Sequence, residues 1–90
     1  MKYFLIEINK PFLEGRAYQD ELQRRISQCE FEVVAVCNTH DEIVKENSRF
    51  IIANVKNQSR KHYEIIEGDG AFGLTGLNAK IDAFYDKIRE

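Results

Sequence analysis

The N-terminal segment that decides the fold is Tyr3-Phe4-Leu5-Ile6-Glu7-Ile8-Asn9. Its side chains are apolar on both alternating faces for most of its length, which is typical of a central strand that is covered on both sides. Lys10-Pro11 ends the strand, because proline has no N–H group to donate to a neighbouring strand. The segment therefore predicts a sheet with this strand in its interior.

Two further segments have the periodicity of amphipathic helices. In the first, which runs from Arg16 to Cys29, apolar residues recur at intervals of 4, 4 and 3, at Tyr18, Leu22, Ile26 and Cys29. In the second, near the C-terminus, the intervals are 4, 3 and 4, at Leu77, Ile81, Phe84 and Ile88. Each run predicts one helix with a single apolar stripe.

Three more apolar segments predict strands, namely Phe31–Cys37, Phe50–Val55 and Tyr63–Glu67. The first is rich in β-branched residues, which favour strands. The polar connection Lys56–Lys61 between the last two is short, so it predicts a hairpin.

The segment Thr39–Arg49 is ambiguous. Thr39 followed by Glu42 matches a capping box, and Asp41 is well placed to interact with a helix dipole. The alternative is a tight turn followed by a short strand at Glu42–Glu46. We favour a short helix.

The expected fold is a single α+β domain over residues 1–90, with the element order β-α-β-(α)-β-β-α. It consists of a four-stranded, mostly antiparallel sheet with two main helices packed on one face. Tyr3–Asn9 and Phe31–Cys37 are expected to pair in parallel across the first helix through a right-handed crossover. The 43% hydrophobic and 31% charged fractions are those of a folded protein.

Charge and cysteine content exclude several classes of protein. With thirteen basic and fifteen acidic residues, the chain lacks the basic surplus of a general nucleic-acid binder. Its two cysteines are too few for a disulfide scaffold, and no secretory signal accompanies them. The apolar run Phe4–Ile6 is too short for a signal peptide or a membrane span. We therefore expect a cytoplasmic protein with reduced cysteines and no membrane association.

Four of the five glycines gather between the last predicted strand and the last helix, at Gly68, Gly70, Gly73 and Gly76. The first three match the GxGxxG pattern of dinucleotide-binding loops, but only seventeen residues follow Gly73. These are too few for the second strand and the ribose-binding acid of that unit. Two interpretations remain. In the first, a phosphate or nucleotide is held by loop N–H groups, Thr75 and the start of the last helix. In the second, the segment is a turn that lets the last helix pack onto the sheet.

A basic cluster, Lys56, Arg60, Lys61 and His62, lies at the predicted hairpin. If the hairpin tip folds near the glycines, Arg60 is suited to grip a phosphate through two hydrogen bonds, with Lys61 as a point charge. Without that proximity the cluster is a solvated turn.

Catalytic and metal-binding patterns are weak. Cys37-x-x-His40 has the spacing of a thiol and a base, but Cys37 ends an apolar strand, where inert buried thiols are common. Together with Cys29 and His62, these residues lack the paired spacings of structural zinc sites. We therefore expect a non-enzymatic protein with no cofactor and no metal.

Two functions from different classes remain. In the first, the chain is a small binding protein that sequesters or senses an anionic small molecule, such as a nucleotide, through Gly68–Gly76 with Arg60 or Lys61. In the second, it is a protein-interaction module, a stoichiometric inhibitor or regulator of a larger protein, for example a host-directed inhibitor. The apolar loop residues Phe12 and Phe72 are its candidate partner contacts, and a second copy of the chain is one such partner.

Overall fold

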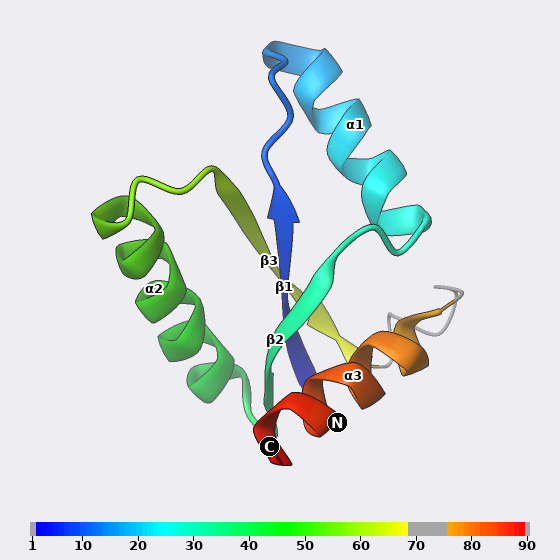
Figure 1. The fold of residues 1–90 in the computed structure, drawn as a ribbon, viewed down its shortest axis with the longest axis vertical. Helices are drawn as coiled ribbons and strands as arrows, with labels where there is room; N and C mark the ends of the chain where they lie inside the picture. The colour runs from blue at the N-terminus through cyan, green and yellow to red at the C-terminus, as the bar shows by residue number, and fades with distance from the viewer. Residues whose placement is uncertain (1, 69–75, 90) are drawn as a thin grey trace.

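The computed structural model describes residues 2–68 and 76–89 and confirms an α+β fold (Figure 1). Its helices and strands alternate along the chain, as β1 Tyr3–Asn9, α1 Gly15–Ser27, β2 Glu32–Cys37, α2 His40–Lys56, β3 Lys61–Glu67 and α3 Leu77–Arg89. The expectation of four strands is wrong for the described residues, which contain three.

The sheet has the order β2-β1-β3, and β1 is antiparallel to both neighbours. The central position of β1 is confirmed, whereas the expected parallel pairing of β1 with β2 is wrong, since Tyr3 lies opposite Cys37. Figure 1 shows the reason. The connection after Asn9 continues beyond the end of the sheet, and α1 runs back over that distance. β2 therefore starts at the end of the sheet where β1 stops.

The predicted strand Phe50–Val55 is wrong, because these residues form the C-terminal half of α2. The helix begins as the capping box predicts, with the Glu42 N–H donating to Thr39 Oγ1 at 3.2 Å. No glycine or proline interrupts it before the cap at Asn57, and a continuous apolar run suits a buried strand and a helix equally well. The connection Lys56–Lys61 consequently joins α2 to β3 and is not a hairpin.

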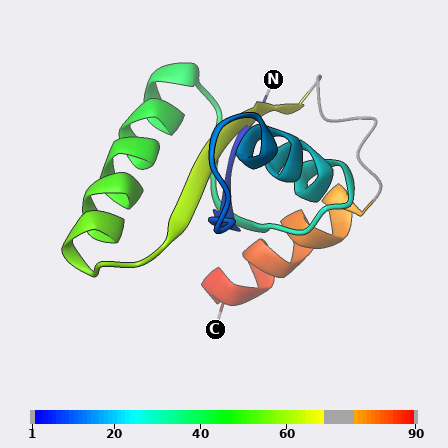
Figure 2. The same cartoon turned by 90° about the horizontal axis from the view of Figure 1, so that it is seen from above.

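Helices cover both faces of the sheet. The two main helices of the expected fold, α1 and α3, lie on one face as predicted, whereas the covering of the other face by α2 was not expected. Figure 2 shows α1 and α3 together on one side and α2 alone on the other. The side of α1 and α3 holds the larger core, with the buried residues Ile6, Ile8, Leu22, Cys29, Phe31, Val33 and Leu77. The buried residues on the α2 side are Leu5, Ala35 and Ile43. α2 is therefore attached to the sheet through a small core.

The two outer strands differ in regularity. The pairing of β2 with β1 shifts between Leu5 and Ile6, so Val34 has no partner on β1 and forms a bulge. β3 pairs with β1 without a shift over all seven residues. Among the helices of the described ranges, none combines the length and the apolar character needed to cross a lipid bilayer.

Candidate functional site

Most of the glycine segment lies outside the described residues, including the predicted ligand residues Gly70, Gly73 and Thr75 and the predicted contact Phe72. Gly68 is described, and its N–H donates to the carbonyl oxygen of Lys2 at 2.7 Å. A Cβ at Gly68 would lie 3.0 Å from that same oxygen, so the close approach of two backbones requires glycine here.

Gly76 stands immediately before α3, with φ of +90°. A Cβ there would lie 3.7 Å from Cys29 Cβ, which is an ordinary contact distance. The positive φ, rather than lack of space, is therefore what favours glycine at this position. Both described glycines thus have structural explanations, and anion binding by the segment between them stays a prediction.

The basic residues of the predicted anion site lie at the start of β3, and Gly68 follows its end. A strand of seven residues is about 23 Å long, so Arg60 and Lys61 are separated from Gly68 by the length of the sheet. The structure does not bring these residues together. Lys61 contacts Asn9 Oδ1 and lies 3.8 Å from Glu7 Oε1.

Arg60 instead meets Phe12, which the sequence analysis assigned to a different site. The guanidinium carbon lies 4.2 Å from the centre of the Phe12 ring, a cation–π arrangement. The same guanidinium donates to the carbonyl oxygen of Pro11 at 3.3 Å. Phe12 is 85% exposed. It therefore lies on the surface, as the prediction of a partner contact requires, and its ring is held in place by Arg60.

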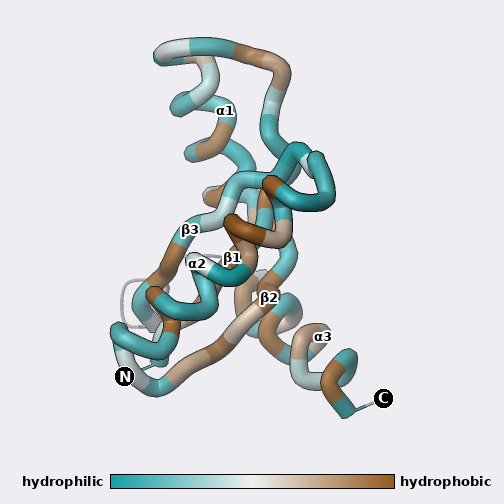
Figure 3. The backbone as a smooth tube through the Cα atoms, turned by 90° about the vertical axis from the view of Figure 1, so that its left-hand side faces the viewer, coloured by the Kyte–Doolittle hydropathy of each residue, from teal (hydrophilic) through white to brown (hydrophobic). Residues whose placement is uncertain are grey.

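The largest group of exposed aliphatic side chains lies on α2 and was not anticipated. We define the α2 stripe as Val44, Ile51 and Val55, which are 40%, 45% and 70% exposed. Residues advance by about 100° around a helix, so these three fall within an arc of about 40°. Ile52, 56% exposed, stands beside them. Figure 3 views the molecule from the side of α2 and shows hydrophobic residues distributed along this helix.

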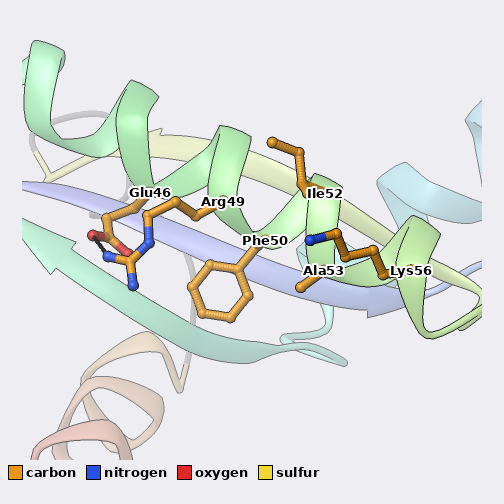
Figure 4. Close-up of a pocket in the computed structure, with 6 residues that line it drawn as sticks. All are labelled: Glu46, Arg49, Phe50, Ile52, Ala53 and Lys56. Atoms are coloured by element: carbon orange, nitrogen blue, oxygen red, sulfur yellow. Dashed lines mark hydrogen bonds and ion pairs between the residues drawn. The ribbon is translucent and has the colours of Figure 1, made fainter.

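A shallow groove of about 440 Å³ follows another side of the same helix (Figure 4). Glu46 and Arg49 form its charged end, joined by an ion pair of 2.8 Å. Phe50 projects from α2 toward the sheet in this view, and its ring packs against Tyr63 with 5.6 Å between centres. Ile52 points away from the sheet side of the helix. The outer surface of α2 thus has an apolar row with charged residues beside it.

The side of α2 that faces the sheet is mainly apolar, with Ile43 buried and Phe50 partly buried. The side-chain oxygens of Asn47 and Asn54 are also buried and have no hydrogen-bond partner. A buried carbonyl group without a partner costs about 1–3 kcal/mol. α2 therefore buries two amide oxygens while four of its aliphatic side chains stay exposed.

Two side chains were considered for catalysis, Cys37 and His40. Burial, followed by the charges of Glu42 and Glu46, raises the pKa of the Cys37 thiol, which disfavours the nucleophilic thiolate. His40 packs edge-on against the Tyr3 ring, with 5.6 Å between ring centres. Over residues 2–68 and 76–89, no group of three or more His, Cys, Asp or Glu side chains is placed to hold a metal ion.

The sequence pattern did not predict the α2 stripe, because the residues of α2 were expected to form a short helix at Thr39–Arg49 and a separate strand at Phe50–Val55. The available signal was the spacing of Val44, Ile51 and Val55 at intervals of 7 and 4, which is visible once the segment is treated as one helix.

Comparison with known proteins identifies no protein family that matches this chain, no curated protein with significant sequence similarity and no solved structure with significant similarity.

Proposed function

We propose that this protein is a small interaction module that binds another protein chain through the α2 stripe. The observation that carries the proposal is the exposed aliphatic surface of α2. The side chains of Val44, Ile51, Ile52 and Val55 are exposed, whereas the amide oxygens of two asparagines are buried without partners. Single exposed aliphatic residues are ordinary on protein surfaces, but four on one helix are more typical of a contact surface.

The stripe has enough area to contribute to binding. The exposed fractions of its three residues and Ile52 together correspond to about two fully exposed side chains. Burying that surface against a partner contributes roughly 3–6 kcal/mol, which supports binding without being sufficient for high affinity alone. Charged residues border the row, as the polar rim of an interface does.

Such a module would act by occupying a surface of its partner. Inhibition or regulation of this kind requires one bound copy per partner and no reacting groups. The proposal therefore needs no role for Cys37 or His40. It also gives Phe12 a function, since a ring that is 85% exposed and held by Arg60 is a pre-formed contact.

Capture experiments with matched variants test the proposal. Wild-type protein and two variants, Ile51→Glu in the stripe and Ile88→Glu on α3, are immobilised and exposed to an extract of the source cells. Ile88 is 63% exposed, so it controls for the loss of an exposed aliphatic side chain elsewhere. We expect Ile51→Glu to lose the proteins that wild type retains and Ile88→Glu to keep them. Capture of the same proteins by Ile51→Glu contradicts the proposal.

A further inference from the structure

β3 presents a regular and unpaired edge. Gly68 donates its N–H to Lys2 and Arg60 accepts from Lys10, so the even-numbered residues of β3 turn their backbone groups toward β1. The odd-numbered residues, Lys61, Tyr63, Ile65 and Glu67, turn theirs to the opposite side. Within the part of the chain that the structure describes, no strand pairs with that side. An edge of this kind is a template for another strand.

The other outer strand is less suitable. The bulge at Val34 interrupts the register of β2 and bends its edge, which is a usual protection against pairing with a further strand. β3 has no bulge. Of the two free edges of the sheet, β3 is therefore the one that fits strand addition.

The α2 stripe faces the same side of the molecule as the free edge of β3. The residues of α2 that contact the sheet core, Ile43 and Phe50, are displaced by about 100° around the helix from the stripe. The right-handed crossover from β2 through α2 to β3 turns the flank with the stripe toward β3. One partner is thus able to cover both the stripe and the edge.

We propose that this partner is a second copy of the chain, which joins β3 to β3 and α2 to α2 across one twofold axis. The inference rests on the proposed function, because it names the occupant of the same surface. α2 and β3 are of similar length, about 25 Å and 23 Å. The proposed axis passes the central residues of both elements, Ser48 and Glu64, and relates each element to its own copy.

Charge complementarity supports the pairing of β3 with its copy. In an antiparallel pair centred on Glu64, Lys61 lies opposite Glu67 of the second copy, and Tyr63 lies opposite Ile65 of the second copy. Opposite charges and aromatic–aliphatic pairs both stabilise neighbouring strands. The two Glu64 side chains face each other at the axis, and this like-charge pair opposes the pairing. Each is hydrogen-bonded at 3.0 Å to His62 of its own chain.

The pairing of α2 with its copy is complementary in the same sense. About an axis at Ser48, Val44 lies opposite Ile52 of the second copy, and the small serine allows the helices to approach closely. Acidic Asp41 at the start of one helix comes beside basic Lys56 at the end of the other. The helix dipoles are antiparallel, which is their favourable arrangement.

The test is the mass of the protein in solution, measured by sedimentation over a wide range of concentration. We expect the wild-type mass to rise from 10.5 kDa toward twice that value. Ile65→Pro removes an N–H that faces the free edge and no bond to β1, so it should stay monomeric. Val36→Pro on the β2 edge should still dimerise. A wild type that stays monomeric at the highest concentration overturns the inference.

A charge exchange tests the register and is independent of any failure to fold. Glu67→Lys places lysine opposite Lys61, and Lys61→Glu places glutamate opposite Glu67, so each variant alone should dimerise about tenfold more weakly. Mixed together, they should recover a one-to-one heterodimer of wild-type affinity. Recovery in the mixture supports the pairing, and its failure overturns it.

The two proposals fail separately. If the wild type is monomeric but Ile51→Glu still loses captured proteins, the partner is a different protein and the proposed function stands. If Ile51→Glu captures the same proteins as wild type, the stripe is not the contact surface and the proposed function fails.

Discussion

Replacing Ile43 by alanine tests how α2 is attached to the sheet. Ile43 is 0% exposed and is one of three buried residues in the core beneath α2. Isoleucine-to-alanine changes at fully buried sites cost about 2–5 kcal/mol, and we expect 3–4 kcal/mol at this position. A domain of this length has a total stability of about 5–13 kcal/mol. The single change should therefore remove a large part of the stability of the protein.

Ile51→Ala is the matched control, because it removes the same atoms from the same helix. Ile51 is 45% exposed, so its truncation should cost only about 1 kcal/mol. Both variants are unfolded in urea and followed by circular dichroism, at concentrations low enough for the chain to be monomeric. If the free energy of unfolding falls equally in the two variants, or by less than about 1 kcal/mol in Ile43→Ala, the assignment of Ile43 as the residue that anchors α2 is refuted.

Three further predictions concern single groups. Burial, and then a hydrogen bond of 2.9 Å to Glu7, raises the pKa of the Tyr63 phenol to about 12 from 10.0. The protonated form is thus favoured in the folded state, so this contribution is complete below pH 10 and lost between pH 10 and 12. Tyr63→Phe should flatten that part of the stability profile, and an unchanged slope in urea titrations would contradict it. Asn54→Leu removes a buried unpartnered oxygen, so it should raise the free energy of unfolding by about 1 kcal/mol, whereas a lower value would show that the amide is satisfied. Gly76→Ala imposes a positive φ on alanine and should cost about 1–2 kcal/mol in the same assay, and a neutral result would exclude backbone strain there.

Local pattern was sufficient for the elements whose periodicity is unbroken. β1, α1 and α3 were each predicted within two residues of their observed bounds, because each has one clear alternation or one apolar stripe. The second half of α2 was not, since Phe50–Val55 satisfies the composition of a strand. What decides its structure is the capped start at Thr39 and the lack of any interruption before Asn57. That information lies outside the segment itself.

The topology depended on a feature that no local pattern records. A connection with a helix usually returns the chain to the start of the sheet and gives parallel strands. Here residues 10–14 extend past the sheet before α1 begins. α1 therefore returns the chain only to the end of the sheet where β1 stopped, and β2 starts there (Figure 1). The length and direction of such a connection follow from packing over the whole domain. The separation of Arg60 from Gly68 has a simpler origin, because the seven residues of β3 lie between them.

The docking of α2 and its exposed stripe are two sides of one arrangement. α2 contacts all three strands and buries Ile43 against Leu5 and Ala35, but it also buries two unpartnered amide oxygens, which lowers what docking contributes to stability. Its remaining aliphatic surface faces outward, where only a partner buries it. Under the proposed function, binding stabilises α2 by a free energy that rises with the logarithm of partner concentration above the dissociation constant, because the partner binds the docked helix and not the detached one. The stability of this layer and the occupancy of the interface are therefore linked quantities, and a change at Ile43 should weaken partner binding although Ile43 itself touches no partner.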